Sequence, residues 1–92
     1  MAKTKVAVTV SRGESVDMVA IHIDGQPVEL LNDRGTASLE PGRHLLMWHF
    51  AGDPGDTLAI IVKTGDTVVR EVKKSRIPAG ENAGAGVGRF EL

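Results

Sequence analysis

Cysteine and tyrosine are both absent from this 92-residue sequence. The lack of cysteine excludes disulfides, thiolate metal sites and a cysteine nucleophile, and it fits a cytoplasmic location. Aromatic residues make up 3% of the chain, namely one tryptophan and two phenylalanines. A domain this small needs its few large side chains for its core, so we predict that Trp48 and Phe50 are buried.

An excess of charge of either sign is also missing. Lysine and arginine number 11 against 12 aspartate and glutamate residues, which gives a formal charge of −1. Such a chain has no field that gathers phosphate backbones, so nucleic acid is not an expected partner. The apolar runs are too short for a signal peptide or a transmembrane helix, so no membrane span is expected and a cytoplasmic location is favoured.

The length of the chain predicts one small domain with one core, or a fragment of a longer protein, because single domains usually span about 100 to 200 residues. A domain of this size buries little more than about 60% of its unfolded surface. That leaves little stability for a large strained catalytic cavity. Binding is therefore an easier task for this chain than catalysis.

Hydrophobic residues recur with a period of two, the spacing that returns side chains to one face of a strand. Val6, Val8 and Val10 share a face of the first strand. Further strands are predicted over residues 18–23, 27–31, 36–40, 44–50, 57–62, 67–73 and 87–92. Turn residues separate them, at Asp24-Gly25, Asn32-Asp33-Arg34-Gly35, Pro41-Gly42, Ala51-Gly52-Asp53-Pro54-Gly55-Asp56 and Gly65-Asp66.

The segment 44–50 predicts the strongest strand. Both of its faces are apolar, with Leu45 and Met47 on one and Leu46, Trp48 and Phe50 on the other. We therefore predict that it is central and covered on both sides.

The segment 67–73 is predicted as a regular strand. Val68 and Val72 share a face with Arg70, and Val69 shares the other with Glu71 and Lys73.

Seven or eight short antiparallel strands with turns between them predict an all-β fold, an immunoglobulin-like β-sandwich. Residues 1–78 form the sandwich in this interpretation. Residues 79–92 form a glycine-rich connector and a terminal strand, which belongs to the same domain or is exchanged with a neighbouring subunit.

Two turns with the strand that follows resemble PEGA-type and related immunoglobulin-like β-sandwich modules. They are Ile21-His22-Ile23-Asp24-Gly25 and Leu39-Glu40-Pro41-Gly42-Arg43-His44. The resemblance implies an accessory or interaction domain of envelope and surface proteins, without catalytic residues. The stretch from Gly80 to Gly88 has no counterpart in that pattern.

Three histidines, His22, His44 and His49, raise the question of a metal site. His44 and His49 have opposite parity on one strand and so lie on opposite faces. His22 meets one of them only across strands, and we predict no metal and no cofactor. A metal-dependent enzyme is the third class of function, and it needs His22 near His44 or His49.

The remaining candidate groups favour structural interpretations. The glycine-rich stretch matches neither a dinucleotide fingerprint nor a Walker loop. Three aspartates are interpreted as turn formers, since the spaced ligands of a calcium loop are missing. Four basic residues are interpreted as a solvated sheet edge. These groups are, in order, Asp53, Asp56 and Asp66, then Arg70, Lys73, Lys74 and Arg76.

The sequence therefore predicts a non-catalytic module with no catalytic residues. It binds another protein, or itself as a homo-oligomer, through a sheet edge or its terminal strand. The alternative is a carbohydrate-binding module that stacks sugar rings on exposed Trp48 and Phe50.

Overall fold

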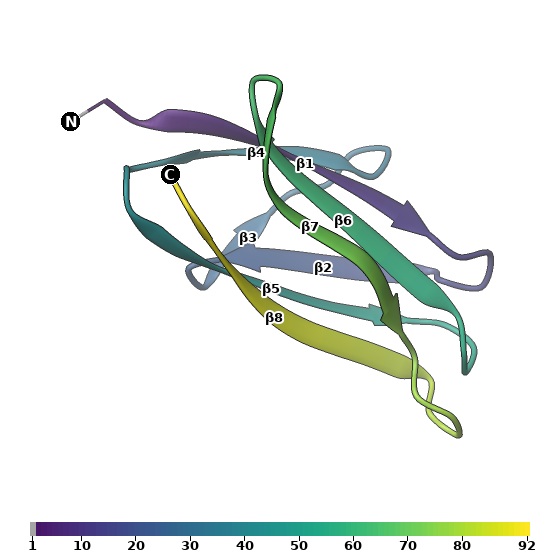
Figure 1. Cartoon of the computed structure of the whole chain (residues 1–92). Helices are drawn as coiled ribbons and strands as arrows, with labels where there is room; N and C mark the ends of the chain where they lie inside the picture. The colour runs from purple at the N-terminus through teal and green to yellow at the C-terminus, as the bar shows by residue number, and fades with distance from the viewer. Residues whose placement is uncertain (1) are drawn as a thin grey trace.

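Eight strands form two antiparallel four-stranded sheets that pack face to face in the computed structural model, which describes residues 2–92 (Figure 1). The strands are β1 (Thr4–Arg12), β2 (Met18–Ile23), β3 (Gln26–Val28), β4 (Arg34–Leu39), β5 (Arg43–Ala51), β6 (Thr57–Thr64), β7 (Thr67–Arg76) and β8 (Ala83–Glu91). Their order is β4-β1-β6-β7 in one sheet and β3-β2-β5-β8 in the other. The prediction of an all-β fold with seven or eight antiparallel strands is confirmed. Within residues 2–92, no helix has the length and apolar character needed to cross a membrane.

The core lies between the two sheets and follows the predicted alternation. Val6, Val8 and Val10 of β1 point inward, as do Ile21 and Ile23 of β2. The inner side chains of β5 and β6 belong to the same cluster. They are Leu46, Trp48 and Phe50 from β5, and Leu58, Ile60 and Val62 from β6.

Two of the predicted turns are tight hairpins whose central residues have positive φ. Asp24 and Gly25 have φ of 52° and 80°, and Asn32 and Asp33 have 53° and 62°. Two consecutive positive φ values define the type I′ turn, which matches the twist of the flanking strands. Leu31 and Arg34 exchange both backbone hydrogen bonds across the second turn, at 2.8 and 3.2 Å.

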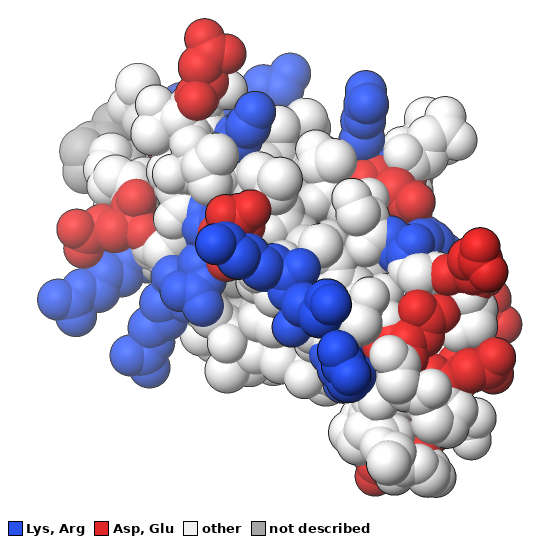
Figure 2. Space-filling model, turned by 45° about the vertical axis from the view of Figure 1, so that its right-hand side comes forward, with Lys and Arg blue, Asp and Glu red and all other residues white. Residues whose placement is uncertain are grey.

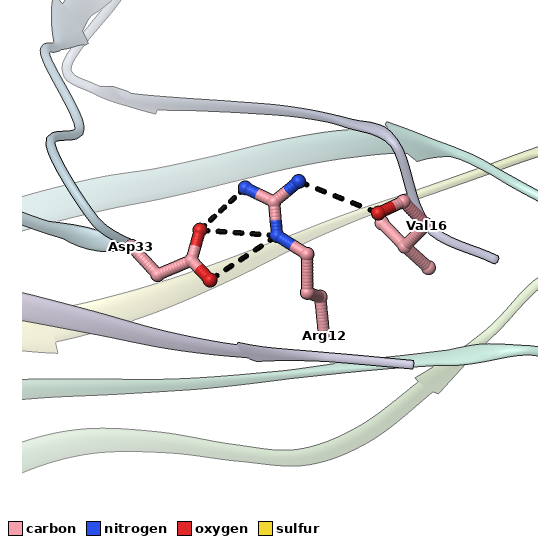
Figure 3. Close-up of polar contacts among 3 residues, drawn as sticks. All are labelled: Arg12, Val16 and Asp33. Atoms are coloured by element: carbon pink, nitrogen blue, oxygen red, sulfur yellow. Dashed lines mark hydrogen bonds and ion pairs between the residues drawn. The ribbon is translucent and has the colours of Figure 1, made fainter. Parts of the chain in front are cut away.

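Arg12 fastens the second of these turns to the rest of the sandwich (Figure 3). Its guanidinium donates to both carboxylate oxygens of Asp33, with Nε 3.0 and 3.2 Å from them, and Nη1 donates to the carbonyl of Val16 at 3.4 Å. Arg12 thereby joins the end of β1, the β1–β2 loop and the β3–β4 turn. This connection holds the point where the chain passes from one sheet to the other.

The regular alternation predicted for β7 is wrong in its first half. The pairing of β7 with β6 shifts register between Val62 and Lys63, and again between Leu58 and Ile60. As a result Val69 packs against the core together with Val72, and Val68 is 49% exposed. A bulge adds a residue to one strand and reverses the faces beyond it, which strict alternation cannot anticipate.

The central position predicted for β5 is confirmed, since β5 pairs with β2 on one side and β8 on the other. Its predicted cover on both faces is wrong. The inner face is buried, whereas Met47 is 40% exposed and His49 is exposed on the outer face. The outer face is apolar in composition without being covered.

The glycine-rich segment is a strand rather than a connector. β8 begins at Ala83, four residues before the predicted start, and pairs with β5 over nine residues from Ala83 to Glu91. Gly84, Gly86 and Gly88 alternate on its inner face. A Cβ at Gly84 would lie 2.8 Å from the Phe50 ring, and one at Gly86 would lie 2.3 Å from the Trp48 ring. Gly84 and Gly86 fit these positions because the rings of Phe50 and Trp48 occupy the space that a side chain would need.

Candidate functional site

The four strands at the margins of the two sheets differ in how they are protected from pairing with another chain. β3 is three residues long and contains Pro27. β4 has residues 29–31 beside it, with the carbonyl of Glu29 against Gly35. β7 has two register shifts and a series of basic residues. Short strands, proline, bulges and charge are the usual ways of blocking an edge.

β8 has none of these protective features between Ala83 and Gly88. This stretch is six residues of alanine, glycine and valine, without charge or proline, and its pairing with β5 is regular. Within residues 2–92, β5 is the partner of β8 in the sheet. The opposite side of β8 is therefore a long unprotected edge.

The hydrogen bonds at the two ends of β8 show which of its residues face this edge. Gly42 and Leu92 exchange both backbone hydrogen bonds, at 3.0 and 2.9 Å, and Gly52 donates to the carbonyl of Asn82. Even-numbered residues therefore bond toward β5. Because antiparallel strands alternate, the backbone groups of the odd-numbered residues point away from β5. These residues are Ala83, Ala85, Val87, Arg89 and Glu91.

The aromatic pair is not available at the surface. Trp48 is 7% exposed and Phe50 is fully buried, as predicted from the scarcity of aromatics. The Trp48 Nε1 donates to the hydroxyl of Ser75 on β7 at 3.0 Å, so the indole joins the two sheets. An exposed sugar-stacking platform of Trp48 and Phe50, the alternative interpretation, is contradicted by this burial.

His44 is a buried histidine with an acceptor at each ring nitrogen. Nδ1 donates to Asp24 at 2.6 Å, and Nε2 donates to the backbone carbonyl of Glu40 at 2.7 Å. A carboxylate and a carbonyl both accept, so both nitrogens carry a proton when both bonds are made. The ring also stacks on Phe90, with centroids 5.4 Å apart. His44 thus fastens the first hairpin turn to the start of β5.

The pKa values of this pair are displaced in opposite directions. The hydrogen bond with Asp24 raises the pKa of His44 above its usual 6.5, helped by the Glu40 carbonyl and opposed by burial. The hydrogen bonds from His44 and from the Leu45 amide lower the pKa of Asp24 below its usual 3.8. Both shifts favour the charged forms of the two side chains, whose polar atoms hold the turn to the start of β5.

His22 and His49 lie together on the outer face of the β3-β2-β5-β8 sheet. Their ring centroids are 6.2 Å apart, with 20° between the ring planes. His44 and His49 lie on opposite faces of β5, as predicted. The condition set for a metal-dependent site, His22 near another histidine, is met by His49. Within the described residues, no group of three His, Cys, Asp or Glu side chains is placed to hold an ion.

The charged candidates occupy the surface and the loops (Figure 2). Figure 2 shows lysine and arginine side chains across the middle of one face and acidic side chains gathered at one end. Lys73, Lys74 and Arg76 are exposed at the margin of β7, whereas Arg70 points inward over Gly88. Nε of Arg70 is buried without a hydrogen bond in the described part of the chain. An inward charge on a strand at the margin blocks further pairing there.

Asp56 is a turn residue, as predicted. It accepts hydrogen bonds from the amide of Ser15 at 2.8 Å, from the Ser15 hydroxyl and from the amide of Thr57. The bonds from Ser15 lower the pKa of Asp56. Its carboxylate therefore fastens the β1–β2 loop to the β5–β6 loop.

The sequence pointed to the terminal strand and to His22 near a second histidine, but it did not assign residues 83–86 to that strand or identify His49 as the partner of His22. Residues 83–86 are not predicted as a strand because glycine-rich composition is typical of connectors. His22 and His49 are 27 positions apart, so the sequence does not show that they are neighbours. A signal for the edge did exist, since the glycines recur with the period of a strand.

Comparison with known proteins supports the fold and leaves the function open. No family model matches the chain. No curated protein matches it either. The chain is similar to a solved structure of a domain of unknown function, DUF4425, from Bacteroides vulgatus ATCC 8482. The identity is 12% and the TM-score 0.51, over 100% of this chain and 98% of that chain.

Proposed function

We propose that this chain is a non-catalytic assembly module that pairs β8 with a β-strand of another chain, in the first instance a second copy of itself. The unprotected edge of β8 carries this proposal. Five residues on one side of the strand present amide and carbonyl groups to the edge, and an added strand satisfies such groups by main-chain hydrogen bonds.

A second copy fits this edge without conflict of charge. When two β8 strands pair antiparallel about a two-fold axis at Val87, odd-numbered residues face odd-numbered residues, which is the set that points outward. Ala85 then lies opposite Arg89 of the second copy, and Ala83 lies opposite Glu91. No like charges face each other directly, so none of the repulsion that destabilises cross-strand pairs arises. The contact is self-complementary, as a two-fold interface requires.

The non-catalytic part of the proposal is supported by how the polar groups are used. Both nitrogens of His44 are engaged with Asp24 and Glu40, and Ser75 accepts a hydrogen bond from Trp48. The hydroxyl of Ser15 lies between Asp53 and Asp56 in a loop contact. In all of these hydrogen bonds the polar groups join turns, loops or sheets, which is a structural role.

A relation to immunoglobulin-like, PEGA-type modules is part of the same proposal. Asp24 of the first turn binds His44, which follows the second turn, at 2.6 Å. The two turns of the resemblance therefore contact each other, and this contact supports the relation. Residues 20 positions apart in the sequence thus form one structural unit.

Replacing Ala85 with proline tests the edge. Proline lacks the amide hydrogen that Ala85 presents to the edge, and the bonds to β5 come from the even-numbered residues. Sedimentation velocity over a range of concentrations is expected to show a dimer for the natural chain and a monomer for Ala85→Pro. The Ala85→Val variant, which keeps the amide, is expected to dimerise.

Circular dichroism and thermal unfolding of each variant check that β8 remains in the sheet. A natural chain that is monomeric at every concentration contradicts self-assembly. A folded Ala85→Pro variant that dimerises like Ala85→Val contradicts the edge as its site.

A further inference from the structure

We propose that the outer face of the β3-β2-β5-β8 sheet binds one copper ion, as Cu(I), through His22, His49 and Met47. The three side chains come from neighbouring positions of two adjacent strands. His22 on β2 lies directly opposite Met47 on β5, and His49 lies two residues further along β5. Side chains directly opposite on antiparallel strands have Cβ atoms about 5 Å apart, within reach of one ion.

The distance between the imidazoles suits an ion between them. The ring centroids are 6.2 Å apart and the planes differ by 20°. An ion about 2 Å from one nitrogen of each ring, with the nitrogens on opposite sides of it, holds the ring centres about 6 Å apart. The two rings are stacked at this separation, and the broad χ2 rotation of histidine can turn a nitrogen of each toward the space between them.

The donor set selects the metal. Two imidazoles and a thioether are soft or borderline ligands, and thioethers favour Cu(I). Hard ions such as Ca²⁺ and Mg²⁺ need oxygen ligands. Within residues 2–92, no acidic group joins these histidines in a set of three ligands. The chemistry therefore points to copper rather than to calcium, magnesium or a zinc site of the usual kind.

The surroundings also fit a soft ion. The two histidines and Met47 line a shallow hollow together with Ala85 and Val87 of β8. These walls are apolar, and they reduce competition from water for the weak thioether ligand. Met47 is 40% exposed although methionine is usually buried, so its sulfur is not committed to the core.

The third histidine serves a different purpose. His44 lies on the inner face of β5, and its two nitrogens bind Asp24 and Glu40. It is therefore excluded from the copper site. This inference is independent of the pairing of β8, since its ligands lie on the face of the sheet and the pairing uses its edge.

Anaerobic titration with Cu(I) against a coloured competing chelator tests the site. One equivalent is expected to bind. The double variant His22→Gln/His49→Gln is expected to lose more than about tenfold in affinity, since even supporting residues contribute that much at metal sites. Met47→Leu is expected to weaken binding as well.

Met18→Leu is the matched control. Met18 is 45% exposed on the same face, but it lies opposite Ala51, four residues from His22 along β2. Its replacement is expected to leave the Cu(I) affinity unchanged. The proposal is overturned by the absence of stoichiometric Cu(I) binding, by unchanged affinity in a folded double-histidine variant, by equal affinities of the Met47→Leu and Met18→Leu variants, or by Zn²⁺ binding more tightly than Cu(I).

Discussion

Gly86→Val is expected to lower the free energy of unfolding by about 3 kcal/mol, the upper part of the usual range for overpacking a core. A Cβ at this position would lie 2.3 Å from Cζ2 and 2.6 Å from Cε2 of Trp48. The indole cannot move away easily, because its Nε1 is bonded to Ser75 on the opposite sheet. Urea unfolding followed by circular dichroism measures the effect.

Ala85→Val is the control for this variant. Ala85 is the preceding residue of the same strand and is exposed on the outer face, so valine there is expected to change stability by less than about 0.5 kcal/mol. Combining Gly86→Val with Trp48→Leu is expected to recover part of the loss, because the smaller side chain leaves room for valine. Equal stabilities of Gly86→Val and Ala85→Val would contradict the packing of glycine under Trp48.

His44→Leu is expected to lower the free energy of unfolding by about 2 kcal/mol at pH 6. It removes two hydrogen bonds of a charged ring, each contributing about 1.5 to 3 kcal/mol in buried settings. The expected loss of stability is smaller than the sum of two such bonds, because Asp24 is 45% exposed and its carboxylate stays hydrated. Leucine keeps an apolar contact with Phe90, so most of the loss comes from the polar bonds.

The pH dependence of stability is expected to show a plateau with a fall on each side. The pKa of His44 is raised, so its contribution is complete below the unfolded value of 6.5 and is lost as the pH rises through the higher folded pKa. The pKa of Asp24 is lowered, so its contribution is complete above 3.8 and is lost as the pH falls through the lower folded pKa. The stabilisation from this pair is therefore greatest between those two values.

The His44→Leu variant provides the test of this profile. Urea unfolding of both chains at a series of pH values is expected to give the largest difference near pH 6 and a smaller one above the folded pKa of His44. An NMR titration that finds the pKa of His44 below 6.5 contradicts the ion pair. A stability difference that does not change with pH contradicts it as well.

The inner face of each strand could be predicted from the sequence wherever alternation is unbroken. Val6, Val8 and Val10 are buried as their spacing indicates. The same reasoning fails at Val68, because a bulge in β7 reverses the faces. It also fails for the outer face of β5, because apolar side chains there indicate a cover that the two-layer fold does not supply.

The candidate sites depend on register, which a single sequence does not determine. From the sequence alone, Gly84 and Gly86 are typical of a flexible connector. Their place in the core follows only from their pairing with Phe50 and Trp48. His22 and His49 likewise become neighbours through the pairing of β2 with β5. The turn residues Asp24 and Gly25 were predictable because their requirement for positive φ is local.

Amide hydrogen exchange along β8, measured by NMR at several protein concentrations, tests the central claim that this strand is built into the sheet and pairs through its free edge. The amides of Gly84, Gly86 and Gly88 are expected to be protected at every concentration, because they bond to β5. Those of Ala85, Val87 and Arg89 are expected to exchange fast in dilute solution and to become protected as the concentration rises. Fast exchange of Ala85, Val87 and Arg89 at every concentration would contradict the pairing, and fast exchange of the glycines would contradict the strand itself.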